Sequence, residues 1–300
     1  MTNLKQAVNH IIFDKISSYC QENNKECFVV GGYVRDFLLK RKSKDIDILV
    51  LGSGIDVAKN IAKQIDEKIQ VTVFKNFGTA YFKFDGFEIE FVGARKESYS
   101  SDSRNPIVES GTLEDDINRR DFKINSMAIS LHPKNFGRLI DMHNGLEDLK
   151  KKIINTPLDA KVTFSDDPLR MLRAVRFASE LNFSVSNSLI KTMENINSRI
   201  EIVTNERIVD ELNKILLSDT PSVGFKLLEK TGLLDYILPE ITNLKGIDEI
   251  EGQKHKDNFY HTLEVLDNIC EATDNLWLRW AALLHDIGKA PTKKFNKKIG

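Results

Sequence analysis

The chain has 300 residues, of which 41% are hydrophobic and 29% are charged, and its formal net charge at pH 7 is −1. This length and composition predict a folded chain with two or more domains, and no apolar stretch is long enough to cross a membrane. A net charge near zero is not typical of a protein that coats nucleic acid indiscriminately, so any such contact must be local.

The N-terminal region and the cysteines indicate the cellular compartment. Residues 1–26 are predicted to be helical, and Lys5, Asp14 and Lys15 interrupt any signal-peptide pattern there. The chain has three cysteines, an odd number without a paired motif, which fits a reducing compartment and argues against a structural zinc site. We therefore expect a cytoplasmic location.

A short apolar run, Cys27–Val30, ends in two adjacent glycines, Gly31 and Gly32. This pattern predicts a buried strand that enters a tight turn. Glycine lets backbone N–H groups approach an anion closely. Residues 34–39 have helical character, which would place a helix N-terminus and Arg35 beside the same turn. The segment therefore predicts a phosphate-binding turn.

Two carboxylates, Asp45 and Asp47, follow in a strand pattern over residues 45–51. Because one residue separates them, both project from the same face of a sheet. Like charges this close repel unless a cation neutralises them, and Mg²⁺ prefers such oxygen ligands together with substrate phosphates. Two ions about 3.5–4 Å apart can hold an attacking hydroxyl and a leaving pyrophosphate. A third carboxylate is expected from a neighbouring strand, with Glu90 as the first candidate and Glu88 as the second. Taken alone, the pattern also fits an ordinary solvated strand edge.

Strands and helices alternate over the rest of this half of the chain. Helices are predicted at residues 56–67 and 113–120, and strands at residues 70–74, 79–84, 87–93 and near 124–131. Residues 95–109 are polar and rich in serine, which predicts a mobile loop beside the site. The alternation indicates a mixed α/β head.

The apolar spacing becomes helical from Asp166 onward, with helices predicted at residues 166–181, 186–196, 205–217 and 222–231. Asp167 and Arg170 are three apart and therefore share a helix face. Such an acceptor and donor would pair with the amine and ring nitrogen of cytosine or adenine, and would leave uracil and guanine unpaired. Arg173 adds positive charge nearby. A surface ion pair is the alternative for an isolated Asp-x-x-Arg motif.

These motifs resemble, in content and order, those of the class II tRNA nucleotidyltransferase and bacterial poly(A) polymerase family, within the polymerase-β-like nucleotidyltransferases. The resemblance covers most of residues 25–217. Besides the two motifs at Gly31–Asp47, it is carried by Arg119-Arg120-Asp121-Phe122-Lys-Ile-Asn125, by Asp141 with Gly145–Leu149, by Asp166–Arg173, and by Glu206-Arg207-Ile with Glu211-Leu212. The family pattern often has Glu at the position of Asp166.

The resemblance implies a role for each motif. Asp45 and Asp47 would be the metal ligands, and our own candidate for a further catalytic carboxylate is Glu90. The triphosphate would be held by Gly31, Gly32 and Arg35. The ribose and its 2′-hydroxyl would be read by Arg120, Asp121 and Asn125, although an ion pair at a helix end is the alternative for Arg-Arg-Asp alone. The base would be read by Asp167 and Arg170, with Arg173 as a further nucleotide-binding residue.

Two segments near the C-terminal end resemble the opening of an HD phosphohydrolase-type domain, at residues 261–265 and 284–289. Histidine and aspartate on helices can bind a divalent metal, and His261, His285 and Asp286 are the candidate ligands. Simple packing of both histidines is the alternative. Because further ligands of such a domain do not follow before Gly300, we expect this domain to be incomplete.

The sequence therefore predicts an α/β polymerase-β-like nucleotidyltransferase head over residues 1–155. An all-α neck and body for base selection and RNA binding is expected over residues 156–242, and a partial helical HD domain over residues 243–300. The expected activity is metal-dependent, template-independent addition of C and A to the 3′ end of tRNA, from CTP and ATP with two Mg²⁺ ions and release of pyrophosphate.

Other activities remain open at this point. A poly(A) polymerase, or an enzyme that adds only CC or only A, shares every motif quoted above. A non-catalytic RNA-binding protein and an HD phosphohydrolase are the alternatives from other classes. The sequence identifies no protein partner.

Overall fold

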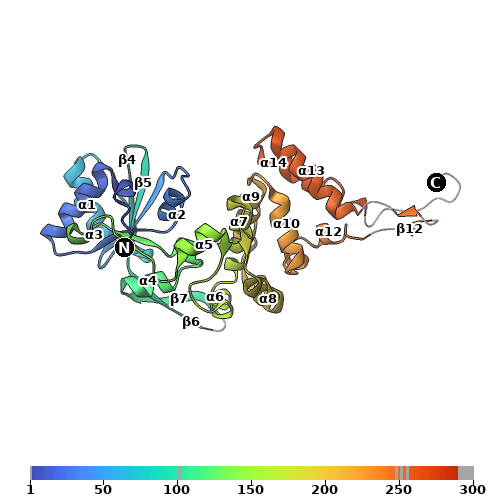
Figure 1. Ribbon diagram of the computed structural model, residues 1–300, viewed down its shortest axis with the longest axis horizontal. Coiled ribbons are helices and arrows are strands. Elements are labelled where there is room, and N and C mark those ends of the chain that lie inside the picture. The colour runs from blue at the N-terminus through green and yellow to red at the C-terminus, as the bar shows by residue number, and fades with distance from the viewer. Residues whose placement is uncertain (1, 101–102, 247–248, 251–252, 255–256, 290–300) are drawn as a thin grey trace. The chain divides into compact units, whose positions relative to one another are not determined.

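The computed structural model describes residues 2–100, 103–246, 249–250, 253–254 and 257–289 (Figure 1). The chain divides into two compact units, Met1–Asp159 and Ala160–Gly300. The first unit combines a sheet with helices and the second is mainly helical, as the sequence predicts. The domain boundaries expected at residues 155 and 242 stay predictions. No helix within the described residues is long and apolar enough to span a membrane.

The first unit is built on a seven-stranded sheet in the order β3-β4-β5-β2-β1-β8-β9. Strand β2 pairs parallel with β5, and the other pairs are antiparallel. The strands are β1 (Cys27–Val30), β2 (Asp45–Val50), β3 (Thr72–Phe74), β4 (Thr79–Phe84), β5 (Phe87–Gly93), β8 (Ala128–Ser130) and β9 (Leu139–Ile140). The strand expected near residues 124–131 is shorter, because the 3-10 helix η3 (Lys123–Asn125) precedes it.

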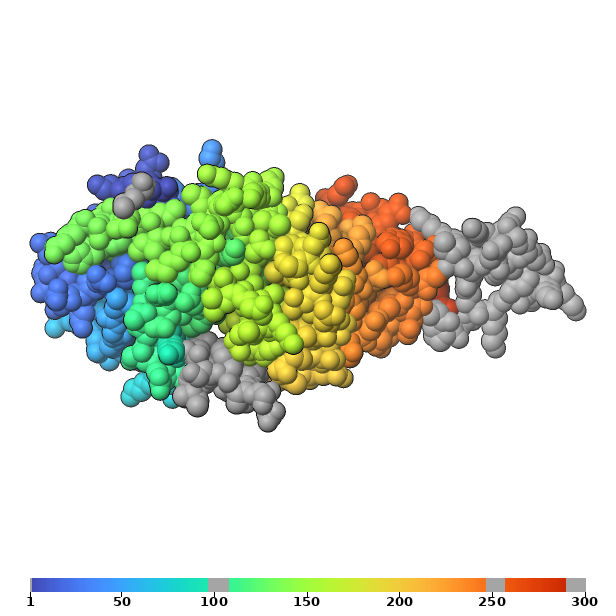
Figure 2. All heavy atoms as spheres, turned by 60° about the horizontal axis from the view of Figure 1, so that its bottom comes forward, coloured from blue at the N-terminus to red at the C-terminus, as the bar shows by residue number. Residues whose placement is uncertain are grey.

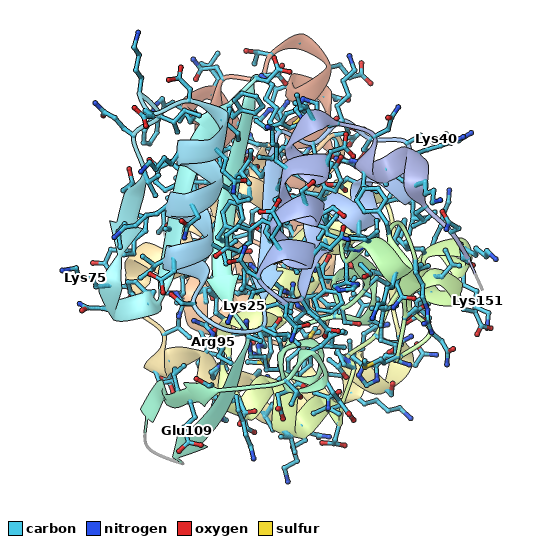
Figure 3. The ribbon with its side chains drawn as sticks, turned by 90° about the vertical axis from the view of Figure 1, so that its left-hand side faces the viewer. Lys25, Lys40, Lys75, Arg95, Glu109 and Lys151 are labelled. Atoms are coloured by element: carbon cyan, nitrogen blue, oxygen red, sulfur yellow. The ribbon has the colours of Figure 1, made fainter. Side chains whose placement is uncertain are left out.

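Helices α1 (Ile11–Glu22) and α3 (Gly54–Ile65) cover one face of this sheet and lie in front of the strands in Figure 3. Alternate residues of β2, Ile46 and Ile48, are fully buried on this side. The helices bury an apolar stripe that includes Ile12, Phe13, Ile16, Val57 and Ile61. Each such side chain contributes about 2 kcal/mol of hydrophobic stabilisation, so this face anchors the sheet.

The opposite face is only partly covered. Phe28, Val30 and Leu49 form a cluster there with Ile117, which lies in α4 (Leu113–Asn118). A capping box between Thr112 and Asp115 fixes the start of α4. Ile117 packs α4 against this cluster, and Arg119 and Arg120, which follow the helix, line a cavity on this face.

The prediction of a mobile loop over residues 95–109 is wrong, because this segment forms an antiparallel ribbon of β6 (Arg95–Ser100) and β7 (Ser103–Ser110). Residues 101–102 lie outside the described residues. Polar strands of this kind pair through their backbones, which a serine-rich composition does not reveal. The other elements of this unit are η1 (Lys5–Val8), α2 (Gly32–Leu38), η2 (Lys75–Phe77), η4 (Pro133–Asn135), α5 (Gly145–Lys151) and β10 (Ile153–Ile154).

The second unit consists mainly of helices. They are α6 (Ala160–Asp166), α7 (Leu169–Leu181), α8 (Asn187–Ile196), α9 (Asn205–Leu216), α10 (Pro221–Lys230), α11 (Leu234–Ile237), α12 (Pro239–Thr242), α13 (Asn258–Ala272) and α14 (Leu276–Leu284). Short elements join them, namely β11 (Ser184–Val185), η5 (Asn197–Ile202), β12 (Glu249–Ile250) and β13 (Gln253–Lys254). Figure 2 shows the outer atoms of α8 to α13, coloured from yellow to red, packed against one another.

The expected helix over residues 166–181 is wrong at its start. Helix α6 ends at Asp166 and α7 begins at Leu169, so that Asp167 lies between two helices. The reason is Pro168, because a proline disfavours helical backbone at the residue before it.

Arg279 ties α14 to the end of α9 inside the second unit. Its side chain is only 2% exposed. Its Nη1 donates to the carbonyl oxygens of Leu216 at 2.6 Å and Ser218 at 2.9 Å. Leu216 is the last residue of α9 and Ser218 follows its C-cap, at a helix end where backbone carbonyls lack partners of their own. A buried cation thus satisfies this helix end.

We expect Arg279→Met to lower the free energy of unfolding of the second unit by about 3 kcal/mol, because it leaves buried carbonyl oxygens without donors. Both tryptophans of the chain, Trp277 and Trp280, lie in α14, so urea unfolding followed by tryptophan fluorescence reports on this unit. Lys230→Met, at an exposed site on α10, is the control. Equal stability of the two variants would contradict the anchoring role.

Candidate active site

Four carboxylates lie side by side on the partly uncovered face of the sheet. The parallel register of β2 and β5 places Asp45 beside Glu88 and Asp47 beside Glu90. A neighbouring strand therefore does bring a third carboxylate next to the two aspartates. We call Asp45, Asp47 and Glu90 the carboxylate row.

Two cavities of about 460 and 220 Å³ open on this face, and Asp47, Phe74 and Glu90 line both of them. Glu88 lines only the smaller cavity and forms an ion pair with Lys83. This geometry favours Glu90 over Glu88 as the third carboxylate. Among the described residues, the ligand atoms of the row do not form a group that lies within 4.8 Å of one another. A cation bound by all three would therefore draw their side chains together.

The surroundings of Asp47 disfavour its charged form. Burial raises the pKa of Asp47 to about 6, and the negative charges of Glu90 and Asp45 act in the same direction. The guanidinium of Arg120 opposes them by lowering the pKa. A partly buried carboxylate beside two others is the kind of donor set that a divalent cation stabilises, so the residues present fit a metal such as Mg²⁺.

Gly31 brings the end of β1 into contact with this site. Its φ angle is +74°, a conformation that other residues rarely adopt. A Cβ atom at this position would lie 3.0 Å from Nη1 of Arg120 and 3.3 Å from Oδ2 of Asp47. Only glycine therefore lets the turn, the carboxylate row and Arg120 meet. At Gly32 a Cβ atom would make an ordinary contact with Arg35 at 3.6 Å.

Arg35, expected beside the triphosphate, makes contacts inside the protein. Its Nε and Nη2 donate to the two carboxylate oxygens of Asp36, each at 2.9 Å. Its Nη1 donates to Oδ1 of Asn125 at 2.8 Å. The guanidinium thus connects α2 with η3, and its predicted contact with phosphate stays a prediction.

Asp121 and Asn125, expected at the ribose, are both buried. Asp121 Oδ1 accepts from the backbone N–H of Phe122 at 2.8 Å and from Nδ2 of Asn125 at 3.1 Å. Gly145 supports this arrangement, since a Cβ atom there would lie 2.2 Å from the carbonyl oxygen of Lys123 in η3. The structure therefore links Arg35, Asp121, Asn125, Arg120 and Gly31 in one network of contacts, which reaches Asp47 at Gly31.

Sequence reasoning missed Asp116, which is fully buried beneath these residues. Its Oδ1 accepts from Nε of Arg119 at 2.9 Å, and its Oδ2 accepts from Nε and Nη2 of Arg120 at 3.1 and 3.0 Å. The spacing of three and four residues along a helix end was the available signal. Glu114 and Asp115 share the acidic run, however, so the sequence does not show which carboxylate is buried.

The residues expected to read the base lie in the second unit. Asp167 Oδ2 contacts Nη2 of Arg207 at 3.3 Å, and its backbone oxygen accepts from the N–H of Arg170 at 3.0 Å. Nη1 of Arg170 donates to the carbonyl oxygen of Thr163 at 3.3 Å. Arg173 lies with its guanidinium carbon 5.5 Å from the centre of the Phe177 ring. Arg207 is the residue that this arrangement adds to the predicted set.

The three candidate ligands near the C-terminal end do converge. Ligand atoms of His261, His285 and Asp286 all lie within 4.8 Å of one another. Asp286 is buried and its Oδ2 also contacts Nζ of Lys289 at 2.6 Å. Nδ1 of His261 is buried and has no hydrogen-bond partner within the described residues. A metal ion would fit this arrangement.

We expect Asp116→Asn to lower the free energy of unfolding by about 2–4 kcal/mol, because it removes the buried partner of two guanidinium groups. Urea unfolding followed by circular dichroism measures this effect. Glu114→Gln, at an exposed position of α4, is the control. A variant as stable as this control would contradict the role of Asp116.

Comparison with known families gives three matches. Residues 27–155 match the family described as "Poly A polymerase head domain". Residues 182–245 match "Probable RNA and SrmB- binding site of polymerase A", and residues 258–300 match "HD domain". The matches follow the order of the head, helical and HD segments expected from the sequence.

Curated relatives and solved structures agree with these matches. The chain is 34% identical over 276 residues to the A-adding tRNA nucleotidyltransferase of Aquifex aeolicus (strain VF5), and the aligned region covers 91% of this chain and 32% of that protein. It is 34% identical over 281 residues to the Multifunctional CCA protein of Shewanella frigidimarina (strain NCIMB 400), covering 89% of this chain and 63% of that protein. The chain thus spans from about a third to two thirds of the length of these relatives.

A solved tRNA nucleotidyltransferase, complexed with a primer tRNA and an incoming ATP analog, has a TM-score of 0.72 to this chain at 30% sequence identity, covering 90% of this chain and 75% of that one. An apo CCA-adding enzyme has a TM-score of 0.74 at 27% identity, covering 99% of this chain and 68% of that one. This chain therefore belongs to the tRNA nucleotidyltransferase and poly(A) polymerase family, whose members are metal-dependent nucleotidyltransferases.

Proposed function

We propose that this chain is a CCA tRNA nucleotidyltransferase, which adds C and A to the 3′ end of tRNA from CTP and ATP without a template. The observation that carries the proposal is the carboxylate row of Asp45, Asp47 and Glu90 with Gly31 and Arg120 in contact with it. Multifunctional CCA proteins are among the relatives. The cytoplasmic location expected from the sequence stays a prediction.

The reaction joins RNA to a nucleotide in one displacement. The 3′-hydroxyl oxygen of the RNA forms a bond to the α-phosphorus of the triphosphate, the bond to the bridging oxygen breaks, pyrophosphate leaves and the hydroxyl proton passes to water. Catalysis of this kind rests on positioning and electrostatics, so no side chain has to act as a general base.

We assign Asp45 and Asp47 as ligands of Mg²⁺, with Glu90 as a further catalytic carboxylate and two ions as the expected number. Bound Mg²⁺ supplies positive charge that activates the attacking hydroxyl and stabilises the leaving pyrophosphate. The support in this chain is the fit of the donor set, since burial and neighbouring carboxylates disfavour a charged Asp47 without a cation.

The residues around the row are assigned to the nucleotide. Gly31, Gly32 and Arg120 would face the triphosphate, because the turn and the guanidinium meet next to Asp47. Arg35 would act mainly by holding Asn125, which it contacts at 2.8 Å. Asp121 and Asn125 then form a buried, hydrogen-bonded pair that can be fixed against the ribose.

Base selection is assigned to Asp167 and Arg170 of the second unit. A carboxylate that accepts from the exocyclic amine and a guanidinium that donates to the ring nitrogen would admit cytosine and adenine. Arg207 contacts Asp167 and would hold its carboxylate in position. Arg173, at the same side of α7 three residues after Arg170, adds positive charge.

An enzyme that adds only A is the second candidate. The observation in its favour is that the relatives from Aquifex aeolicus and Geobacter sulfurreducens, each 34% identical to this chain, are A-adding tRNA nucleotidyltransferases. The motifs described above are compatible with both activities, so the products have to separate them.

The test supplies purified protein and Mg²⁺ with tRNA that lacks its 3′ CCA, or that ends in CC, together with CTP, ATP or both. We expect growth to CCA followed by a stop when both nucleotides are present, which sequencing of the product ends will show. Asp47→Asn should reduce the rate by at least about 1000-fold, because it removes a ligand charge from the row. Asp56→Asn, on the covered side of the sheet, is the matched control.

Other products would favour other members of the family. Addition of A only to tRNA ending in CC indicates the A-adding activity, and a long A tail indicates a poly(A) polymerase. Extension by Asp47→Asn at the rate of the control variant would contradict the assigned chemistry. Failure of the wild type to extend any of these RNAs would contradict the proposed function.

We expect Asp167→Ala to lower kcat/KM for CTP and ATP about 10- to 100-fold and to reduce the preference for them over UTP and GTP, because a hydrogen bond to the base is lost. Competition among the four nucleotides, with sequenced products, measures this preference. Asp210→Ala, at an exposed site on α9, is the control. If Asp167→Ala keeps the wild-type preference for CTP and ATP over UTP and GTP, other residues select the base.

We further propose that His261, His285 and Asp286 bind a divalent metal. The unpartnered buried Nδ1 of His261 is the observation that favours it among the described residues. Titration with Co²⁺ alone, followed by visible absorption, should show one ion per chain at these ligands and a loss of at least about tenfold in affinity for His285→Ala. His132→Ala, in the first unit, is the control. Equal Co²⁺ affinity of the two variants would indicate that the histidines only pack.

A further inference from the structure

Two aromatic rings are exposed beside the carboxylate row, although no motif in the sequence singles them out. Phe77 is 68% exposed and Phe74 is 44% exposed. Both line the larger cavity together with Asp47 and Glu90. Leaving such large apolar side chains in water forfeits burial that stabilises a fold, so exposed rings beside a site indicate a binding surface.

The pairing of β3, β4 and β5 places this aromatic surface directly next to the carboxylates. Glu90 of β5 pairs with Tyr81 of β4, so Tyr81 shares the face of the carboxylate row. Phe74 of the edge strand β3 pairs with Thr79 of β4 and shares that face as well. The rings of Phe74 and Tyr81 are stacked, with centres 6.0 Å apart and planes 12° from parallel. We name Phe74, Phe77 and Tyr81 the aromatic shelf.

The aromatic shelf and the glycine turn lie on opposite sides of the row. The strand order β3-β4-β5-β2-β1 places the shelf beyond Glu90, whereas Gly31 follows β1 on the other side of Asp47. A direct displacement at phosphorus needs the attacking and leaving oxygens roughly in line. If the triphosphate lies toward Gly31, the attacking RNA end arrives from the side of the shelf.

Positive charge accompanies the shelf. Arg95, Arg119 and Arg120 line the larger cavity. Lys75 is exposed between Phe74 and Phe77, and Figure 3 shows its side chain at the outer edge of the sheet, directed away from the protein. Aromatic rings for bases combined with basic groups for the phosphate backbone form the usual surface for single-stranded nucleic acid.

We infer that the aromatic shelf stacks the terminal base of the RNA that is extended, and so sets its 3′-hydroxyl beside Asp47 and Glu90. This inference rests on the proposed function, because it names the place of the RNA end at the same site. Stacking uses the π-face that every base has, so it accepts any terminal base. That property suits an enzyme whose RNA end changes with each nucleotide added.

Phe77 gives the sharpest test, because its side chain is the most exposed of the three. The probe is an RNA with 2-aminopurine as its 3′-terminal base, whose fluorescence falls when the base is stacked. We expect Phe77→Ala to weaken binding of this RNA about 5- to 100-fold and to remove the fluorescence change, while Kd for ATP stays within about twofold. Phe77→Tyr keeps a ring and should bind the RNA within about twofold of wild type.

Two controls separate stacking from simple packing. Phe77→Leu keeps an apolar side chain without a π-face and should resemble Phe77→Ala. Ile11→Ala removes an exposed apolar side chain on α1, at the opposite face of the sheet, and should leave RNA binding unchanged. If Phe77→Leu binds the RNA as well as Phe77→Tyr, the side chain packs against protein and the inference is overturned.

The experiment also distinguishes this inference from the proposed function. Wild type that extends RNA, with Phe77→Ala binding the probe equally well and with the same fluorescence change, overturns the inference and leaves the function in place. The opposite result is that the wild type extends no RNA, yet the fluorescence change seen with the wild type is lost in Phe77→Ala. That result supports stacking on the shelf and overturns the proposed activity.

Discussion

One buried carboxylate, Asp116, holds two guanidinium groups in place on the partly uncovered face of the sheet. It lies at the end of α4 and accepts hydrogen bonds from both Arg119 and Arg120. Arg120 is thereby held against Gly31 and beside Asp47. A fixed guanidinium offsets part of the repulsion within the carboxylate row and leaves the remainder to a cation. These side chains are therefore already ordered, and this preorganisation reduces the rearrangement of polar groups that the proposed reaction requires.

The site consequently has two chemically different sides. The glycine turn borders Asp47 on one side, and aromatic rings border Glu90 on the other. The two carboxylates lie on the adjacent strands β2 and β5, so the spacing between these strands sets the distance between the two sides. The residues proposed to select the base, around Asp167, lie in the other unit of the chain.

The sequence predicts most elements of the first unit, because alternating apolar residues mark the strands 79–84 and 87–93 with the bounds that the structure has. It also anticipates a third carboxylate beside Asp47. It fails where backbone pairing joins two polar strands, as in the ribbon β6–β7. It misses Asp116 because nothing in an acidic run shows which carboxylate is buried, and Phe77 because an exposed ring becomes informative only once its neighbours are known.

In the proposed reaction, attack and departure occur on opposite sides of the carboxylate row, in one direct displacement. A test uses a nucleoside triphosphate with sulfur at the α-phosphorus, as a single stereoisomer, and determines the configuration of the new linkage in the RNA. We expect inversion at phosphorus. Retention would require two successive displacements through a covalent intermediate, and would contradict the arrangement of substrates on the two sides of Asp47 and Glu90.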